Sequence, residues 1–241
     1  MDMSSQIDKL VAQAWDRFQE QDKDERLLIA TAGIPGSGKT TVTYKVTRAL
    51  NEKYARENPN SPPVAIFVPM DGYHLTRAQL SAMPDPENAH ARRGAEFTFD
   101  GDGFLSLVKE LRQRVTPSTE TVFAPSFDHA VKDPKENDIP ILPSQRIVLF
   151  EGNYVLLNKL PWSTAASLMD LRWFVEVDVE VARKRLVTRH LAAGIAATIE
   201  EADKRAVTND LVNGEQILKC RVPVNQVVVS VEEEGWPGDI D

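Results

Sequence analysis

Residues 33–40 read GIPGSGKT, and this octet fits the pattern G-x-x-x-x-G-K-[ST] at its fixed positions, Gly33, Gly38, Lys39 and Thr40. A short apolar run, Leu27–Ala30, precedes the octet, and a stretch of helical character follows it to about residue 54. The pattern requires a strand before the loop and a helix after it. The octet therefore predicts a phosphate-binding loop (P-loop) at a strand–helix junction, rather than a chance match in a surface turn.

Such a loop has a definite chemistry. Its glycines let backbone N–H groups approach a phosphate closely, and the helix that follows adds its positive N-terminal end. The Lys39 ammonium would reach the β- and γ-phosphates, and the Thr40 hydroxyl would bind Mg²⁺. We predict that ATP and Mg²⁺ are bound here, with the nucleotide held by Gly33, Ile34, Pro35, Gly36, Ser37, Gly38, Lys39, Thr40 and Thr41.

The composition is that of an ordinary globular protein, with 241 residues, 42% hydrophobic and 27% charged. The net charge of −8 argues against a general nucleic-acid surface. The single cysteine, Cys220, excludes an internal disulfide and a cysteine-based metal site. The acidic N-terminus lacks the features of a signal peptide, and no apolar run reaches the length of a membrane span. We expect a cytoplasmic protein, monomer or homodimer, that binds neither nucleic acid nor membrane.

Short apolar runs mark the buried strands of an α/β fold. They lie at Leu27–Thr31, Val64–Met70, Ile147–Phe150, Leu171–Val177 and Gln226–Val231, with a shorter one at Thr121–Ala124. Helical patterns cover the first 20 residues and residues 102–115, 179–193 and 199–217. Strands that alternate with helices predict a three-layer α/β fold with a mostly parallel sheet.

We expect one P-loop domain over residues 1–241, with an N-terminal helix in residues 1–22 and a helical lid around residues 183–200. The proline-rich stretch from Pro125 to Pro143 interrupts the α/β pattern. We interpret it as a loop inserted on the substrate side rather than as a linker.

A second motif, VPMDGYHLTR at residues 68–77, ends the second predicted strand. In an open α/β sheet the ligand crevice lies at the C-terminal strand ends, which would place Asp71 across from the P-loop. A carboxylate there can accept the proton of an acceptor hydroxyl and help to hold Mg²⁺. We predict these roles for Asp71, with Tyr73 and His74 at the substrate; the alternative is that Asp71 caps a helix or begins a turn.

The third motif is IVLFEGNYVLL at residues 147–157. An apolar run leading into Glu151 is typical of a Walker B strand, whose carboxylate binds Mg²⁺ directly or through water. The sequence has neither the guanine-reading N-K-x-D element of GTPases nor the L-S-G-G-Q element of transporters. Both absences favour a kinase over these other P-loop classes.

The three motifs together resemble the P-loop kinases of the uridine kinase, phosphoribulokinase and bacterial pantothenate kinase group, over residues 27–231. RRGAEFTFDGDGF, APSFDHAVKDP and TRHLAAG…NDLVNG are most similar to a subgroup of fungal and bacterial kinases described only broadly. The resemblance implies that Asp71 is the catalytic aspartate, Thr40 and Glu151 are Mg²⁺ ligands, and Lys39 is the phosphate lysine. It also implies a lid after the fifth strand, whose arginines close over ATP.

Arginines of the predicted lid are candidate catalytic groups. Arg185 and Arg189 are four residues apart and share one helix face, and Gly194 supplies a hinge. Cations on a closing lid would stabilise transition-state charge and exclude water. We predict that Arg185 and Arg189 act in this way, with Arg183 a weaker candidate; the alternative for each is a solvated helix face.

The acceptor side is predicted from two segments, residues 92–100 and 125–134. Phe127 stands where similar kinases have a tyrosine, so a hydroxyl contact is lost and stacking is kept. His129 either hydrogen-bonds the acceptor or lies on the surface.

Arg92 and Arg93 are adjacent cations on this acceptor side. They either bind a carboxylate or phosphate of the acceptor or bridge to Asp85 and Glu87. Side chains of adjacent residues diverge, so we expect only one of the two to face the cleft.

The sequence thus predicts an ATP-dependent kinase that phosphorylates a hydroxyl of a small nucleoside-, pantothenate- or sugar-like metabolite. The alternative is an ATP-hydrolysing switch or assembly factor with a protein partner. The absence of the uridine kinase pattern FDHPDAFD favours the alternative, whereas Asp71, the lid and the acceptor-like loop favour transfer.

Overall fold

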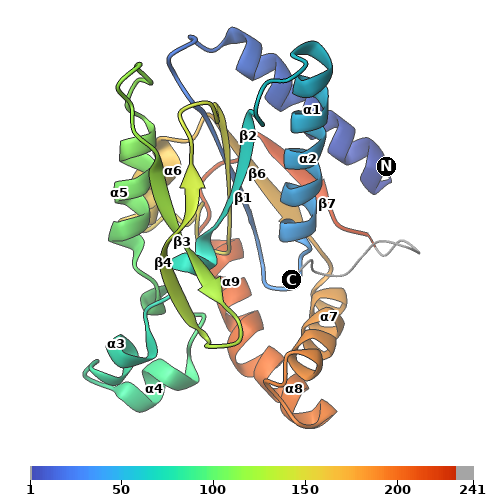
Figure 1. Cartoon of the computed structure of the whole chain (residues 1–241). Coiled ribbons are helices and arrows are strands. Elements are labelled where there is room, and N and C mark those ends of the chain that lie inside the picture. Colours follow the sequence, from blue (N-terminus) through green and yellow to red (C-terminus); the bar gives the residue numbers. More distant parts are fainter. Residues whose placement is uncertain (1, 232–241) are drawn as a thin grey trace.

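The strand that leads into the P-loop lies at the centre of a five-stranded sheet. The computed structural model describes residues 2–231 and gives the strand order β2-β5-β1-β6-β7 (Figure 1). All neighbouring pairs in this sheet are parallel. The strands are β1 (Leu27–Gly33), β2 (Ala65–Pro69), β5 (Ile147–Glu151), β6 (Leu171–Glu176) and β7 (Gln226–Val229). The predicted α/β fold with a mostly parallel sheet is confirmed.

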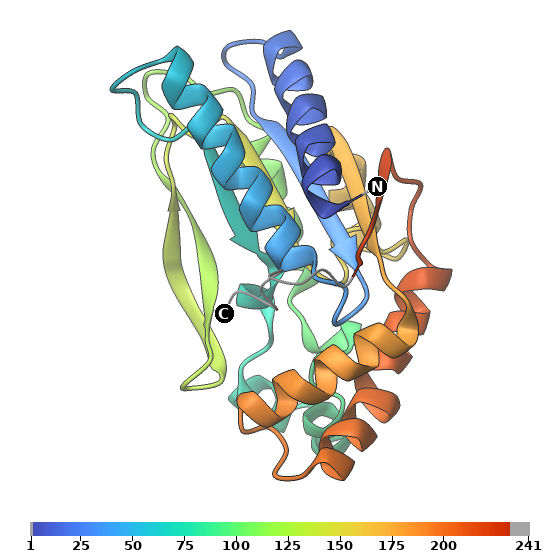
Figure 2. The ribbon, with the colours of Figure 1, turned by 90° about the vertical axis from the view of Figure 1, so that its right-hand side faces the viewer.

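β1 is buried along its whole length because helices cover both faces of the sheet. Leu28 and Ala30 pack in one hydrophobic cluster, and Leu27 and Ile29 pack in the other, since alternate residues of a strand point to opposite faces. Figure 2 shows α1 and α2 side by side over one face. The helices that contribute to the two clusters include α1 (Met3–Glu20), α2 (Lys39–Glu57), α5 (Gly101–Leu111) and α6 (Trp162–Ser167).

The stretch predicted as a proline-rich loop is for the most part an antiparallel hairpin. β3 (Val122–Asp128) pairs with β4 (Asp133–Ile141) in a separate two-stranded sheet. The register shifts between Ala124 and Ser126, so Pro125, which has no N–H to donate, falls in the irregularity. Both strands of such a sheet are edge strands, where proline is tolerated, and the prediction of a loop is therefore wrong.

The remaining elements gather beyond the C-terminal strand ends, at the lower end of the molecule in Figure 2. They are the short turns η1 (Met70–Tyr73) and η2 (Glu96–Thr98) and the helices α3 (Arg77–Ser81), α4 (Pro86–Ala91), α7 (Val179–Ala192), α8 (Ile199–Arg205) and α9 (Leu211–Lys219). A π-helical turn, η3 (Ala206–Asp210), joins α8 to α9. Within residues 2–231, none of the helices is both long and apolar enough to cross a membrane.

Candidate active site

The P-loop contains two glycines whose backbone is left-handed. Gly36 has φ 77° and Gly38 has φ 83°, a region that residues with a Cβ atom rarely adopt. Gly38 is the N-cap of α2, so the N–H groups of the first helical turn face the loop. A Cβ atom on Gly36 would lie 2.7 Å from the carbonyl oxygen of Ala182 on α7. The loop therefore has the shape of a phosphate cradle, and α7 packs directly against it.

The side chains of the loop differ in where they point. Pro35 lines a cleft next to the loop, whereas Ile34 belongs to the hydrophobic core. Ser37 and Thr41 are buried, and their hydroxyls have no hydrogen-bond partner in residues 2–231. Ile34, Ser37 and Thr41 are therefore positioned to shape the loop rather than to present side chains to the cleft.

Lys39 and Glu151 meet at the base of the P-loop. β1 and β5 are neighbours, and Thr31 on β1 lies opposite Glu151 at the end of β5. The Lys39 Nζ atom lies 3.7 Å from Glu151 Oε1, and the two side chains are only 11% and 7% exposed. A nearly buried ammonium beside a nearly buried carboxylate is the pairing expected of a phosphate lysine and a Walker B acid.

The cleft next to the loop has a volume of about 720 Å³. Its lining includes Lys39 and Thr40 after β1, Asp71 and His74 after β2, and Glu151 at the end of β5. Residues that the sequence placed in three separate motifs thus share one cleft. This is where a parallel α/β sheet is expected to bind its ligand.

The oxygen atoms in the cleft suit Mg²⁺. Thr40, Asp71 and Glu151 all line it, and hydroxyl and carboxylate oxygens are the ligands that magnesium prefers. In the described part of the chain, no three His, Cys, Asp or Glu side chains are grouped so that they could hold a metal ion by themselves. A small number of carboxylates fits Mg²⁺, which usually takes its other ligands from phosphates and water.

Asp71 lies in η1, directly after β2, and its side chain is 51% exposed. Its backbone carbonyl accepts hydrogen bonds from the His74 backbone N–H at 3.1 Å and from His74 Nδ1 at 2.9 Å. The turn fits closely under the hairpin, since a Cβ atom on Gly72 would lie 2.1 Å from the carbonyl oxygen of Pro125. The backbone around Asp71 is therefore fixed while its carboxylate stays open to the cleft.

His74 is held between two aromatic rings, with ring centroids 4.0 Å from Phe99 and 4.9 Å from Phe127. Burial lowers the pKa of His74 below its ordinary value of 6.5, although the nearby Asp71 opposes the shift. The ring is neutral at pH 7, and its Nδ1–H donates to the Asp71 carbonyl because a carbonyl oxygen can only accept.

Tyr73, predicted at the substrate, lies on the opposite side of the turn. Its side chain is in the hydrophobic core, with its ring edge-on to Phe104 at 5.4 Å. Burial raises the pKa of the Tyr73 hydroxyl. Tyr73 is not among the residues of the cleft, because neighbouring residues of a tight turn cannot both face it.

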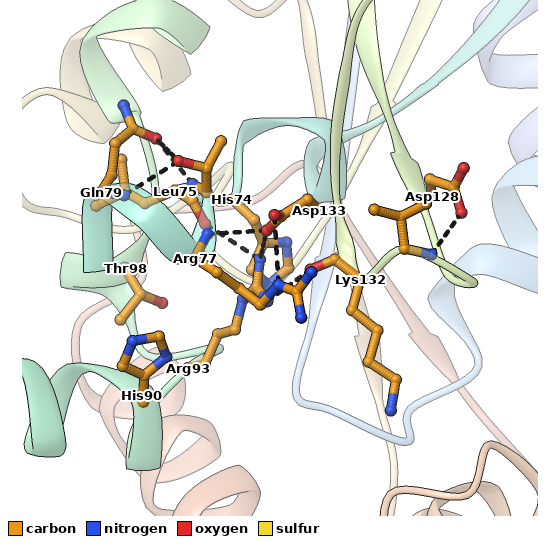
Figure 3. Close-up of polar contacts among 12 residues, drawn as sticks. His74, Leu75, Arg77, Gln79, His90, Arg93, Thr98, Asp128, Lys132 and Asp133 are labelled. Atoms are coloured by element: carbon orange, nitrogen blue, oxygen red, sulfur yellow. Dashed lines mark hydrogen bonds and ion pairs between the residues drawn. The ribbon is translucent and has the colours of Figure 1, made fainter. Parts of the chain in front are cut away.

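Arg92 and Arg93 are each bonded to other protein groups. Arg92 donates to the side-chain oxygens of Asn209 at 2.8 Å and Asn213 at 2.7 Å. Arg93, which lines the cleft, donates to the carbonyl oxygens of Leu75 and Lys132 and forms an ion pair with Asp133 (Figure 3). As expected, only one of the two arginines, Arg93, lines the cleft. The alternative of ion pairs with Asp85 and Glu87 is wrong, because both arginines bond to other groups.

Phe127 and His129 come from the end of β3 and the hairpin tip, and both line the cleft. Their ring centroids are 5.1 Å apart, and the Arg93 guanidinium lies 5.5 Å from the Phe127 ring centroid. Together with His74 they give this side of the cleft an aromatic wall.

The arginines of α7 have three different surroundings. Arg189 lines the cleft. Arg185 reaches the P-loop, where its Nη1 donates to the Gly36 carbonyl at 3.2 Å and to Ser230 Oγ at 2.9 Å. Arg183 forms a two-point ion pair with Asp203 on α8, at 2.6 and 2.7 Å, and is a link between helices.

Comparison with known proteins identifies the family. The sequence matches the phosphoribulokinase/uridine kinase family over residues 28–196. The chain belongs to this family. Membership makes it a P-loop kinase and implies ATP binding, typically with Mg²⁺, and a small-molecule substrate.

Individual kinases of known sequence or structure agree with this assignment. The ATP-dependent kinase-like protein notR' of Aspergillus versicolor is 56% identical over 159 residues, which are 66% of this chain and 92% of that protein. The Schizosaccharomyces pombe protein C227.14, provisionally named a uridine kinase, is 44% identical over 209 residues, 87% of this chain and 84% of that protein. A crystal structure of a Silicibacter sp. TM1040 kinase, provisionally assigned to a fructose transport system, has a TM-score of 0.75 and 31% identity, covering 90% of this chain and 98% of that one.

The cleft of this P-loop kinase also contains residues to which the motifs assigned no role. They include Phe99, Lys132, Asn153, Arg205, Asp210 and Asn213. Asn153 could have been found, because it lies in the third motif, two residues after Glu151. Asp210 lies in the quoted stretch NDLVNG. Arg205 carries no comparable signal, because it faces the cleft next to the π-helical turn η3.

Proposed function

We propose that this P-loop kinase transfers the γ-phosphate of ATP to a hydroxyl group of a small nucleoside-, pantothenate- or sugar-like metabolite. The observation that carries the proposal is the position of Asp71, whose half-exposed carboxylate opens to the same cleft as Lys39 and Glu151. An acceptor hydroxyl between that carboxylate and the P-loop would meet both its base and the phosphate.

The ATP side of the site follows from the P-loop. The loop N–H groups and Lys39 would bind the β- and γ-phosphates, and Thr40 and Glu151, with help from Asp71, would hold Mg²⁺. Mg²⁺, when bound, would neutralise part of the negative charge on the phosphates. Arg189 in the cleft and Arg185 against the loop would bring further positive charge from the predicted lid.

Asp71 suits the role of general base because, within residues 2–231, no lysine or arginine forms an ion pair with its carboxylate. The His74 Nδ1 atom lies 4.0 Å from Asp71 Oδ1. That ring is uncharged at pH 7, since burial lowers its pKa, and its N–H is already bonded to the backbone. The carboxylate therefore keeps its capacity to accept a proton from the substrate.

The competing function is a nucleotide switch that hydrolyses ATP and responds to a protein. A switch does not require an aromatic wall of His74, Phe127 and His129 facing the base, whereas a small acceptor gains orientation from such a wall. The wall and the exposed carboxylate together favour transfer.

ATP turnover measured with and without a metabolite extract tests the proposal. A kinase should release ADP only when an acceptor is present, and mass spectrometry should find a product heavier by one phosphoryl group. Asp71→Asn should lower turnover about 10²- to 10⁴-fold and leave MgATP binding unchanged. Acceptor-independent release of phosphate that a protein partner stimulates would instead identify a switch.

A further inference from the structure

The π-helical turn η3 changes which residues of the α8–α9 segment face the cleft. Arg205 and Asp210 both line it although they are five positions apart. In an α-helix of 3.6 residues per turn, such residues would point about 140° apart. A π-helical turn closes over five residues and brings them to the same side. Turns of this kind occur frequently at functional sites.

Three other polar side chains of this segment, Asn209, Asp210 and Asn213, are engaged with the protein. Asn209 accepts from Arg92 and donates to the Arg93 carbonyl at 3.1 Å, and Asn213 also accepts from Arg92. Asp210 Oδ2 lies 2.9 Å from Nε2 of the buried His190. These contacts fix the segment against the acceptor side of the cleft and against α7.

Arg205 differs from these neighbours. Its side chain is half-buried, its Nε atom is buried without a hydrogen-bond partner, and it forms no ion pair within residues 2–231. Removing part of a guanidinium from water without a partner costs free energy. The other cations of the cleft include Lys39 and Arg93, and these are paired with Glu151 and Asp133 respectively.

We infer that Arg205 is a ligand-binding residue of the cleft and that its guanidinium binds anionic oxygens of a phosphate or carboxylate group. The inference rests on the proposed function. An oxyanion would satisfy Arg205 with the two-point geometry that arginine favours. The group has two sources, the phosphate chain of the nucleotide or an anionic group of the acceptor.

Two binding measurements distinguish these sources. The first is calorimetry with Mg²⁺ and a non-hydrolysable ATP analogue. The second is the thermal stabilisation that inorganic phosphate gives to protein already saturated with that analogue. If the nucleotide is the source, Arg205→Gln should bind the analogue about 10-fold more weakly or worse. If the acceptor is the source, analogue binding stays normal and stabilisation by phosphate is lost.

The controls use the same helix. Lys204→Gln makes the same change of charge at an exposed position outside the cleft and should behave as wild type in both measurements. Arg205→Lys keeps the charge but loses the planar guanidinium fork, so its binding should be weaker than that of wild type and stronger than that of Arg205→Gln. If Arg205→Gln matches wild type in both measurements, the inference is overturned. Failure of the proposed function would be seen separately, as absent acceptor-dependent ADP release, because neither measurement needs turnover.

Discussion

Arg93 and Asp133 form an ion pair, with Nη2 2.9 Å from Oδ1, between the acceptor side of the cleft and the first residue of β4. Asp133 also accepts from the backbone N–H of Arg77 at 2.9 Å, and Arg93 donates to the Lys132 carbonyl (Figure 3). The hairpin tip, which brings His129 to the cleft, is thus tied to α3 and to residue 93 through one carboxylate.

Replacement of Asp133 by Asn should loosen this tip. The Arg93–Asp133 side chains are 16% and 22% exposed, so loss of the charge-assisted bonds should lower the free energy of unfolding by about 1–3 kcal/mol. The hairpin tip lines the half of the cleft that would bind the acceptor. The KM for the acceptor should therefore rise, while the KM for ATP should stay unchanged. Urea unfolding and steady-state kinetics would measure the two effects. Equal changes in both KM values would contradict a local role.

The same carboxylate should give a pH-dependent stability. Burial raises the pKa of Asp133, but hydrogen bonds from Arg77 and Arg93 outweigh it and hold the pKa below the ordinary 3.8. The folded state therefore keeps the carboxylate charged when the unfolded state takes up a proton. The stabilisation is complete above pH 3.8 and is lost as the pH falls through the lower folded pKa. The stability difference between wild type and Asp133→Asn should shrink in that range, and urea unfolding at a series of pH values below 4 would show it.

His74 should also make stability fall as the pH falls, but in a higher pH range than Asp133. Its folded pKa is depressed below 6.5 by burial, so the unfolded chain binds a proton first as the pH falls. Stability should therefore decrease from pH 6.5 downward until the folded pKa is reached. NMR titration of the histidine rings would give the pKa directly. His74→Asn, which can still donate to the Asp71 carbonyl, should reduce the pH dependence; a His74 pKa at or above 6.5 would reject the expectation.

The sequence predicted the parallel sheet, and the meeting of its motif residues in one cleft, for a physical reason. A strand buried on both faces is a continuous apolar run, as at Leu27–Thr31, and the P-loop pattern ties particular residues to a strand–helix junction. The positions of Lys39, Asp71 and Glu151 around one cleft follow from strand ends meeting at one edge of the sheet.

The acceptor half could not be predicted as closely, because it depends on contacts between distant segments. Tyr73 and His74 are adjacent aromatic residues with a polar group each, yet one packs on Phe104 and the other faces the cleft. The link between Arg92 and Asn209 joins residues separated by 117 positions. No local pattern encodes such a link or the π-helical turn that carries Arg205 into the cleft.

Gly36→Ala should damage nucleotide binding more than stability. The new Cβ would lie 2.7 Å from the Ala182 carbonyl at a φ of 77°, so the P-loop must shift away from α7. Affinity for MgATP should fall at least about 10-fold, since a phosphate cradle depends on exact backbone placement. Gly194→Ala is the matched control, with φ 62° and no atom within 4 Å of the new Cβ. It should lose about 1 kcal/mol to left-handed strain, and thermal unfolding of the two variants would show how much of the Gly36→Ala effect on stability is strain alone. Calorimetry would measure the affinity of Gly36→Ala for MgATP.

Arg92→Ala should reveal a residue that positions the cleft rather than one that binds the acceptor. The side chain donates to two buried asparagines, Asn209 and Asn213, which are only 4% and 2% exposed. Its removal leaves both oxygens without that donor, so the free energy of unfolding should fall by about 1–3 kcal/mol. Arg92→Lys keeps the charge but lacks the planar fork, and it should recover only part of the loss. If Arg92→Ala instead kept full stability and raised the acceptor KM about 10- to 100-fold, Arg92 would have to reach the acceptor, and the contacts with α9 and its π-helical turn would be secondary.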